Sequence, residues 1–288
     1  MQRCAFLTLE DPTGYHIDDD RAIPVFADRG WAVETIPWSL AGVDWTQYDA
    51  VVVRSTWDYQ KDAGRFFGVL DGIRDSGVPL FNDLELMRWN ADKNYLADLA
   101  TRGVEVVPTI YGSRFAPGDT AHFAQILGSD ELVIKPVVGA NAERTWRLDS
   151  PADQASAAKA FVRDAFMVQV FASSVQEEGE LSLFFFDGAY SHAIKKQPKN
   201  GDFRVQEEHG GRITAFQPTP SQLESARQVM GALSGTPLYA RVDLIRSNDD
   251  ADWWLMELEL IEPSMYLRMD ADAPERFVQA FLSQIASR

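Results

Sequence analysis

Acidic side chains with regular spacing mark the C-terminal part of the chain. Glu257 and Glu259 lie two residues apart in the apolar stretch 253–260, and Asp243 lies inside a second apolar stretch, 238–245. Residues two apart on a β-strand face the same side of a sheet, so antiparallel pairing of the two stretches would bring the three carboxylates together. Such a set repels unless a cation lies among its members, and oxygen-only ligands favour Mg²⁺ or Mn²⁺. The pattern indicates a metal site, with a solvated acidic sheet face as the alternative.

Two lysines stand at positions that suit a phosphate group. Lys135 ends the apolar run 132–134 and is followed by Pro136 and the small-residue loop 139–142. A cation at a strand end beside such a loop can bind phosphate. Lys93 lies at the start of an expected helix, where an N-capped surface helix is the alternative interpretation. Taken singly, each lysine has a solvated surface position as its simpler explanation.

Composition and missing motifs exclude several classes of function. The formal net charge of −16 argues against nucleic-acid and membrane partners, although a nucleotide pocket needs only a few local cations. The single cysteine, Cys4, excludes an internal disulfide and a multi-cysteine metal site. The chain has no G-x-x-x-x-G-K-S/T phosphate loop, G-x-G-x-x-G fingerprint or G-x-S-x-G elbow. It also lacks a signal-peptide pattern and a membrane-spanning apolar run, so we expect a cytoplasmic protein.

The elements that must position these residues alternate at first between strand and helix. Expected strands are 4–9, 31–36, 50–53 and 78–81, and expected helices are 21–29 and 64–75. The short apolar run 50–53 is typical of a buried parallel strand. This order predicts an open parallel βαβ sheet, which binds ligands where its strands end.

The remainder of the chain predicts two mixed α+β lobes. Expected helices are 92–100, 120–127, 151–164, 221–234 and 274–287, and expected strands are 106–111, 131–135, 167–171, 180–186, 189–195, 238–245 and 253–260. Asp187-Gly188 between two of these strands is a hairpin signal. We therefore expect an α/β protein with an N-terminal substrate-binding domain at 1–84, a central lobe at 85–170 and a C-terminal lobe at 171–288.

A run of polar and aromatic residues follows the third expected strand: Arg54, Ser55, Thr56, Trp57 and Asp58. An open α/β sheet presents its substrate contacts at this edge. Arg54 could clamp a carboxylate through two parallel hydrogen bonds. A helix-capping turn made by Ser55 and Thr56 is the alternative.

Taken in order, these features resemble the ATP-grasp superfamily over residues 1–288. Further support comes from the stretch Lys195-Lys196-Gln197-Pro198, Gly201-Asp202-Phe203-Arg204-Val205-Gln206 and Gly210-Gly211. It is similar to the G-D-F-R-x-N and G-G pattern of prokaryotic glutathione synthetases, with Gln206 in place of the asparagine. The run from Arg54 is similar to a subgroup that includes the D-cycloserine-forming cyclo-ligase. The resemblance implies an ATP-grasp fold in which the two α+β lobes enclose ATP.

The resemblance also assigns roles to single positions. Its phosphate-binding lysines match Lys93 and Lys135, and its adenine hinge matches Gln169, Val170 and Phe171. The residue that holds the ribose hydroxyls is best matched by Glu180, with Glu177 and Glu178 as competitors. The magnesium ligands match Asp243, Glu257 and Glu259, although the third is usually asparagine. The catalytic positions are Arg204, which would contact the acyl phosphate, and Arg241; Ser264 joins the run 54–58 as a substrate contact.

The implied reaction activates a small carboxylate with ATP as an acyl phosphate and passes it to an amine, which releases ADP and phosphate. An intramolecular cyclo-ligase and a non-catalytic nucleotide-binding module are the alternatives. The family's glycine-rich lid corresponds to residues 137–144, which hold one glycine, so the lid contacts to phosphate stay open. We expect small-molecule carboxylate and amine partners, with Mg²⁺ or Mn²⁺, and leave the oligomeric state open, a homodimer included.

Overall fold

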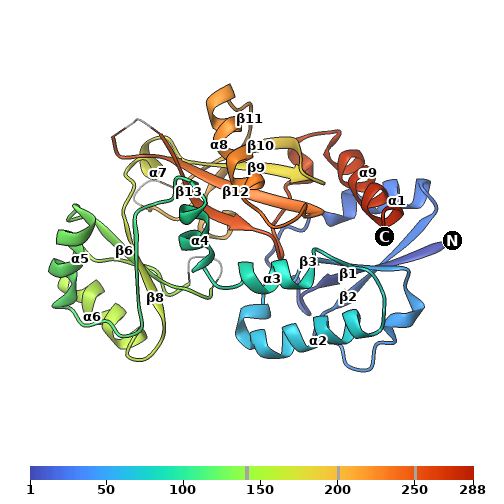
Figure 1. Ribbon diagram of the computed structural model, residues 1–288, viewed down its shortest axis with the longest axis horizontal. Coiled ribbons are helices and arrows are strands. Elements are labelled where there is room, and N and C mark those ends of the chain that lie inside the picture. Colours follow the sequence, from blue (N-terminus) through green and yellow to red (C-terminus); the bar gives the residue numbers. More distant parts are fainter. Residues whose placement is uncertain (140–142, 200–201, 250–251) are drawn as a thin grey trace.

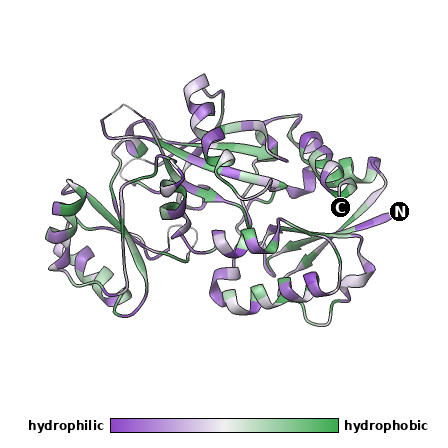
Figure 2. Ribbon diagram, in the orientation of Figure 1, coloured by the Kyte–Doolittle hydropathy of each residue, from purple (hydrophilic) through white to green (hydrophobic). Residues whose placement is uncertain are grey.

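The protein consists of three β-sheets with helices packed on them (Figure 1). The computed structural model describes residues 1–139, 143–199, 202–249 and 252–288. Within these ranges no helix combines the length and hydropathy needed to cross a membrane. Figure 2 shows mainly hydrophobic strands in the first sheet, and helices that alternate between hydrophobic and hydrophilic residues.

The first sheet is parallel, as predicted, with the order β2-β1-β3-β4. Its strands are β1 (Gln2–Thr8), β2 (Trp31–Pro37), β3 (Ala50–Ser55) and β4 (Leu80–Phe81). Every residue of β3 is buried. Val51 and Val53 pack with Phe66 and Leu70 of helix α2 (Ala63–Asp75), whereas Val52 belongs to the core on the opposite face. Helices on both faces explain why this strand is an unbroken apolar run.

The opposite face of the first sheet is covered partly by the last helix of the chain. Helices α1 (Ile23–Asp28) and α9 (Ala273–Ala286) lie side by side in Figure 1. Phe277 and Phe281 of α9 share a core with Phe6 and Phe26. The helix expected at 21–29 is divided into η1 (Asp19–Arg21) and α1, because Pro24 is tolerated only in the first turn.

A second sheet holds the central part of the chain. It is antiparallel, with the order β5-β8-β6-β7, and its strands are β5 (Thr109–Gly112), β8 (Phe166–Val170), β6 (Leu132–Pro136) and β7 (Trp146–Arg147). Helices α5 (Asp119–Leu127) and α6 (Pro151–Ala160) pack against it. The strand expected at 106–111 starts later, since Pro108 has no N–H and Val107 bonds to Leu255 instead. The two-residue strand β7 is too short for a sequence pattern.

The third sheet is antiparallel and carries the acidic strands. Its order is β11-β10-β9-β12-β13, with β11 (Arg212–Phe216), β10 (Ala189–Gln197), β9 (Glu180–Phe186), β12 (Tyr239–Arg246) and β13 (Trp253–Glu259). Asp187 and Gly188 join β9 to β10 with positive φ angles of 48° and 74°, which confirms the predicted hairpin. Helix α8 (Pro220–Gly231) begins with a capping box between Thr219 and Gln222.

Short elements connect the sheets. Helix α4 (Tyr95–Thr101) matches the helix expected at 92–100, helix α3 (Leu84–Asn90) was not predicted, and α7 (Ser174–Glu177) precedes β9. Asp83 caps α3 by accepting hydrogen bonds from the N–H groups of Glu85 and Leu86. The remaining short helices are η2 (Trp45–Gln47), η3 (Tyr59–Asp62), η4 (Glu207–His209) and η5 (Leu267–Met269).

Candidate active site

A cavity lies where the three sheets meet. Its walls come from the end of β6 and β8 in the second sheet, from β9, β10, β12 and β13 in the third, and from the loop after β3. The cavity therefore collects residues that are far apart in the sequence, among them Trp57, Lys135, Glu180 and Glu262.

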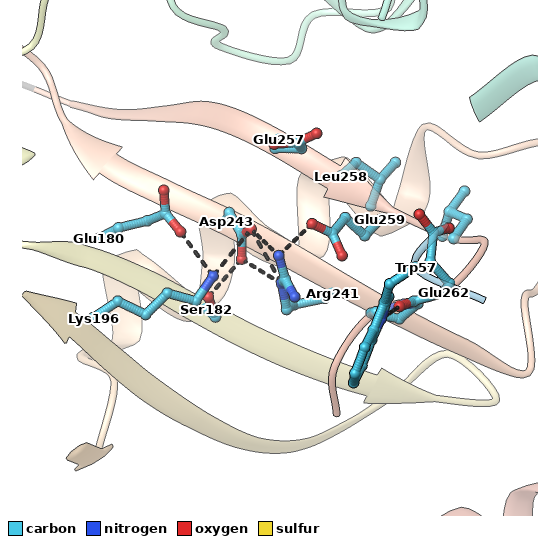
Figure 3. Close-up of polar contacts among 12 residues, drawn as sticks. Trp57, Glu180, Ser182, Lys196, Arg241, Asp243, Glu257, Leu258, Glu259 and Glu262 are labelled. Atoms are coloured by element: carbon cyan, nitrogen blue, oxygen red, sulfur yellow. Dashed lines mark hydrogen bonds and ion pairs between the residues drawn. The ribbon is translucent and has the colours of Figure 1, made fainter. Parts of the chain in front are cut away.

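The three carboxylates share one region of β12 and β13, and each contacts a basic group. Asp243 is opposite Glu257 in the strand pair, and Arg241 is opposite Glu259. The Arg241 guanidinium donates to Asp243 at 2.8 Å and also to Glu259. The Lys93 ammonium lies 2.8 Å from Glu257. Figure 3 shows Asp243 and Arg241 between Glu180 on one side and Glu259 on the other.

The donor set suits a hard divalent cation, but the side chains are not arranged around one. All three carboxylates supply only oxygen, the ligand that Mg²⁺ and Mn²⁺ prefer. Burial raises the pKa of Glu259 to about 7, with smaller contributions from the negative charges of Glu257 and Asp243. Among the described residues, no group of three or more Asp, Glu, His or Cys side chains is placed to hold a metal ion. The protein's own cations contact these carboxylates instead.

Lys135 and Lys93 both line the cavity but differ in their partners. Lys93 contacts Glu257 and donates to the carbonyl of Gly139 at 2.7 Å. Lys135 forms no ion pair within the described part of the chain, and its side-chain nitrogen lies 3.9 Å from the Met256 sulfur. Partial burial lowers the pKa of Lys135 to about 8, and Lys93 lowers it further against the opposing effect of Glu257. Lys135 is therefore a partly buried cation available to an anionic ligand.

The expected adenine hinge lies on the wall formed by β8. Val170 and Phe171 line the cavity, and so does Gln169, whose side chain donates to Thr109 Oγ1 at 3.0 Å. The Phe171 ring lies 6.1 Å from the ring of Phe203 in an edge-on arrangement. An apolar slot with nearby backbone groups can hold a flat heterocycle.

Glu180 lines the cavity, whereas its two competitors do not. The Glu180 carboxylate accepts from Lys196 at 2.9 Å, and burial raises its pKa. Glu177 is exposed, and Glu178 forms an ion pair with Arg246. The structure thus favours Glu180 over both alternatives as a group that faces a ligand.

Arg204 reaches the cavity from the loop before η4. Its guanidinium contacts Asp202 at 2.8 Å, and hydrogen bonding to that carboxylate raises the pKa of Arg204. The neighbouring Gly201 and the loop residues Ala140, Asn141 and Ala142 lie outside the described residues.

The predicted substrate run is only partly at the cavity. Trp57 and Ser264 line it, and Trp57 Nε1 donates to the carbonyl of Glu262 at 2.8 Å. Ser55, Thr56 and Asp58 lie outside the cavity wall: Ser55 bonds to Thr8, and Asp58 accepts from Trp38.

The substrate clamp expected at Arg54 is corrected by the structure. Arg54 is 2% exposed and does not line the cavity. Its Nη2 donates to Asp19 at 2.9 Å and to the Pro263 carbonyl at 3.1 Å, and its guanidinium lies 4.9 Å from the centre of the Tyr239 ring. An arginine committed to these partners supports the fold rather than a ligand.

The cavity residues without an assigned role in the sequence analysis include Tyr59, Lys196 and Glu262. Lys196 is opposite Glu180 in the β9–β10 pair and lies 3.4 Å from Asp243. The alternation of β10 offers a signal for it, because Lys196 shares a face with the buried Ile194. Tyr59 begins the short helix η3 and Glu262 lies in the loop after β13, and no periodicity marks a site at either position.

Comparison with known proteins agrees with this geometry. Residues 4–82 match the family "D-cycloserine synthetase DcsG, N-terminal domain". The cycloserine biosynthesis protein DcsG of Streptomyces lavendulae is 32% identical over 279 residues, covering 89% of this chain and 90% of the relative. The crystal structure of D-cycloserine synthetase DcsG is similar with a TM-score of 0.86 at 29% identity, covering 98% of this chain and 99% of that one. A glutathione synthetase of Prochlorococcus marinus (strain MIT 9313) is 29% identical over 71% of this chain and 62% of the relative.

These likenesses confirm the predicted fold and the resemblance seen in the sequence, since they extend over all three sheets. The chain therefore belongs to the ATP-grasp superfamily of ATP-dependent, carbon–nitrogen bond-forming ligases, as a member of its DcsG family.

Proposed function

We propose that this protein uses ATP to phosphorylate the carboxylate of a small amino-acid-derived substrate and then joins the activated carbon to a nitrogen. The observation that carries the proposal is Lys135, a partly buried cavity cation with no ion-pair partner among the described residues. It lies in a cavity with a second lysine, Lys93, and an apolar slot at Phe171. A nucleoside triphosphate matches these three features together.

In this proposal the two α+β lobes, 85–170 and 171–288, hold the nucleotide between them. The adenine lies against residues 169–171, the ribose hydroxyls bond to Glu180, and the phosphates extend toward Lys93 and Lys135. Domain 1–84 supplies substrate contacts through Trp57, which lies at the cavity edge away from Glu180 (Figure 3).

Asp243, Glu257 and Glu259 would hold Mg²⁺ or Mn²⁺ beside the phosphates. When bound, such an ion neutralises phosphate charge during phosphoryl transfer. Ligation by the carboxylates would release Lys93 and Arg241 from their present contacts and leave both cations free for the phosphate oxygens.

The chemistry needs no protein nucleophile. A carboxylate oxygen attacks the γ-phosphorus of ATP, ADP leaves, and a nitrogen lone pair then attacks the carbonyl carbon of the acyl phosphate and expels phosphate. Arg204 and Arg241 stabilise the charge that collects on oxygen in both steps.

A second candidate is closure of a ring within one substrate molecule. It is favoured by the DcsG likeness, which covers 89% of the chain and includes a match to the N-terminal domain at 4–82. In that case the nitrogen belongs to the same molecule as the carboxylate, and the reaction needs no separate amine.

ADP release across a panel of D- and L-amino acids and their aminooxy analogues tests both candidates. We expect magnesium-dependent ADP release with at least one acid. Release that needs an added amine indicates joining of two molecules, and release without one indicates ring closure. No ADP release with any acid, in the presence of hydroxylamine as a general trap, contradicts the proposed function.

A further inference from the structure

One end of the cavity holds a carboxylate, Glu262, that differs from the carboxylates of β9, β12 and β13 in its partners. Glu180, Asp243, Glu257 and Glu259 each contact a lysine or arginine. The Glu262 side chain forms no ion pair or hydrogen bond within the described part of the chain. Lys93 and Arg241 are the cations that influence it, and each already contacts another carboxylate.

The surroundings of Glu262 are aromatic. Trp57 is fixed there because its Nε1 donates to the backbone carbonyl of Glu262 at 2.8 Å, and the ring of Tyr15 lies 5.2 Å from that of Trp57. Tyr59, which is 6% exposed, also lines this end of the cavity. Burial raises the pKa of Glu262 well above its ordinary value, with Glu259 adding to the effect. An ionised carboxylate in this position lacks a positive partner.

Two hydroxyl groups complete the set. The side-chain hydroxyls of Tyr59 and Ser264 face the same cavity and, among the described residues, have no hydrogen-bond partner. Buried polar groups in a folded protein normally have partners, so a convergent set without them is typical of a ligand subsite. A carboxylate with aromatic faces and hydroxyl oxygens offers acceptors and π-density, which together suit an organic ammonium group.

The position of this subsite agrees with that ligand. In Figure 3 the charged row runs from Glu180 and Lys196 at one end, through Asp243 and Arg241, to Glu259, with Trp57 and Glu262 at the other end. The proposed ribose contact and the proposed acyl-transfer site therefore lie on the same side of Glu262. A group held at Glu262 belongs to the substrate that receives the phosphoryl group rather than to ATP.

We propose that Glu262, with Tyr59, Trp57 and Ser264, binds the ammonium group of the substrate and selects amino acids over acids that lack an amine. This inference rests on the proposed function for the location of the acyl-transfer site. Because Glu262 would recognise the substrate, its substitution should change the substrate's binding affinity and not the rate of phosphoryl transfer.

Binding of matched probes tests the subsite without requiring turnover. We would use D-cycloserine with isoxazolidin-3-one, and D-serine with 3-hydroxypropionate, since the members of each pair differ only in the amine. Calorimetry with a non-hydrolysable ATP analogue and Mg²⁺ present should show the amine-bearing member binding about 10- to 100-fold more tightly to the wild type. Glu262→Gln should reduce this preference to about twofold or less while affinity for the ATP analogue stays the same.

The matched control is Glu208→Gln, which removes the same charge from an exposed glutamate on the cavity rim. It should retain the preference for the amine. Glu262→Gln should also melt at the same temperature as the wild type or higher, because it removes a partly buried carboxylate with no ion-pair partner among the described residues. A wild type that binds both members of each pair equally, or a Glu262→Gln variant that keeps the preference, overturns the ammonium subsite.

These outcomes separate the inference from the function on which it rests. A retained binding preference together with no ADP release would support the subsite and contradict the ligase proposal. ADP release that is equally fast with amine-bearing and amine-free acids would support the ligase proposal and overturn the subsite.

Discussion

Lys135 shows how a single residue can carry a binding function. It is partly buried near Lys93, and this burial lowers its pKa to about 8 from an ordinary value of 10.5. Keeping this ammonium charged at neutral pH therefore costs the folded protein free energy. Phosphate oxygens would offset that cost, which makes nucleotide affinity sensitive to the charge of one side chain.

We expect Lys135→Ala to weaken ATP binding by about 1–3 kcal/mol at pH 7, the usual scale for losing a charged hydrogen-bond partner. In the wild type, affinity should fall about tenfold between pH 7 and pH 9, because the Lys135 ammonium deprotonates above its pKa of about 8. Lys135→Arg stays charged across this range and should lose the pH dependence. Calorimetric titrations at both pH values check this, and an unchanged pH profile in Lys135→Arg would show that another group is responsible.

The paired acids of β13 should differ in their effect on stability. Lys93 and Lys135 lower the pKa of Glu257 against the effect of burial, whereas burial raises the pKa of Glu259 to about 7. At pH 8, Glu257→Gln should therefore lower the free energy of unfolding by about 1–3 kcal/mol, since it leaves Lys93 without its carboxylate. Glu259→Gln should leave stability unchanged or raise it, because Arg241 keeps Asp243 as a partner.

Chemical denaturation without metal or nucleotide measures both values. Both variants should lose most of the ADP-forming activity if the carboxylates hold the metal. Equal stability losses in the two variants would contradict the electrostatic account of this strand, and full activity in Glu257→Gln would contradict its place in the metal site.

At the scale of elements, Arg54 joins β3 to the segment after β13. Its guanidinium contacts Asp19 before α1 and the carbonyl of Pro263, and it lies 5.8 Å from the ring centre of Phe277 in α9. The pair with Asp19 is buried, so both charges depend on one another. The end of β3, which the sequence suggested for substrate binding, instead connects the first sheet to the segment after β13 through the contacts of Arg54.

Arg54→Met should destabilise the protein by about 3–5 kcal/mol, the scale for leaving one partner of a buried ion pair uncompensated. Arg54→Met combined with Asp19→Asn should recover part of that loss, because neither charge is then left alone. Urea unfolding gives the stability of each variant, and ATP affinity under native conditions should match the wild type. A stable Arg54→Met variant with poor substrate affinity would restore the substrate role instead.

At the scale of the whole molecule, periodicity in the sequence was enough to predict the parallel first sheet and the long strands of the third. It also predicted the Asp187-Gly188 hairpin and the antiparallel pairing that brings Asp243 close to Glu257 and Glu259, because both depend on local patterns. The edge strand β11 and the two-residue strand β7 were missed, since neither has an apolar run that differs from its surroundings.

Contacts between distant segments could not be predicted in the same way. The packing of α9 on the first sheet and the pairing of Arg54 with Asp19 depend on how the three sheets meet. The same holds for Glu262 and Tyr59, which reach the cavity from a loop after β13 and from the start of η3, far apart in the chain. Residues on regular strands were therefore placed correctly more often than residues in loops.

The most direct test of the central claim follows one oxygen atom. The active acid from the ADP-release panel would be labelled with ¹⁸O in its carboxylate, and the released phosphate analysed by mass spectrometry. Attack of the carboxylate on ATP, followed by expulsion of phosphate by nitrogen, predicts one ¹⁸O in the phosphate for each product formed. Product formation with unlabelled phosphate, and with the lost ¹⁸O found in AMP or in water instead, would contradict the account.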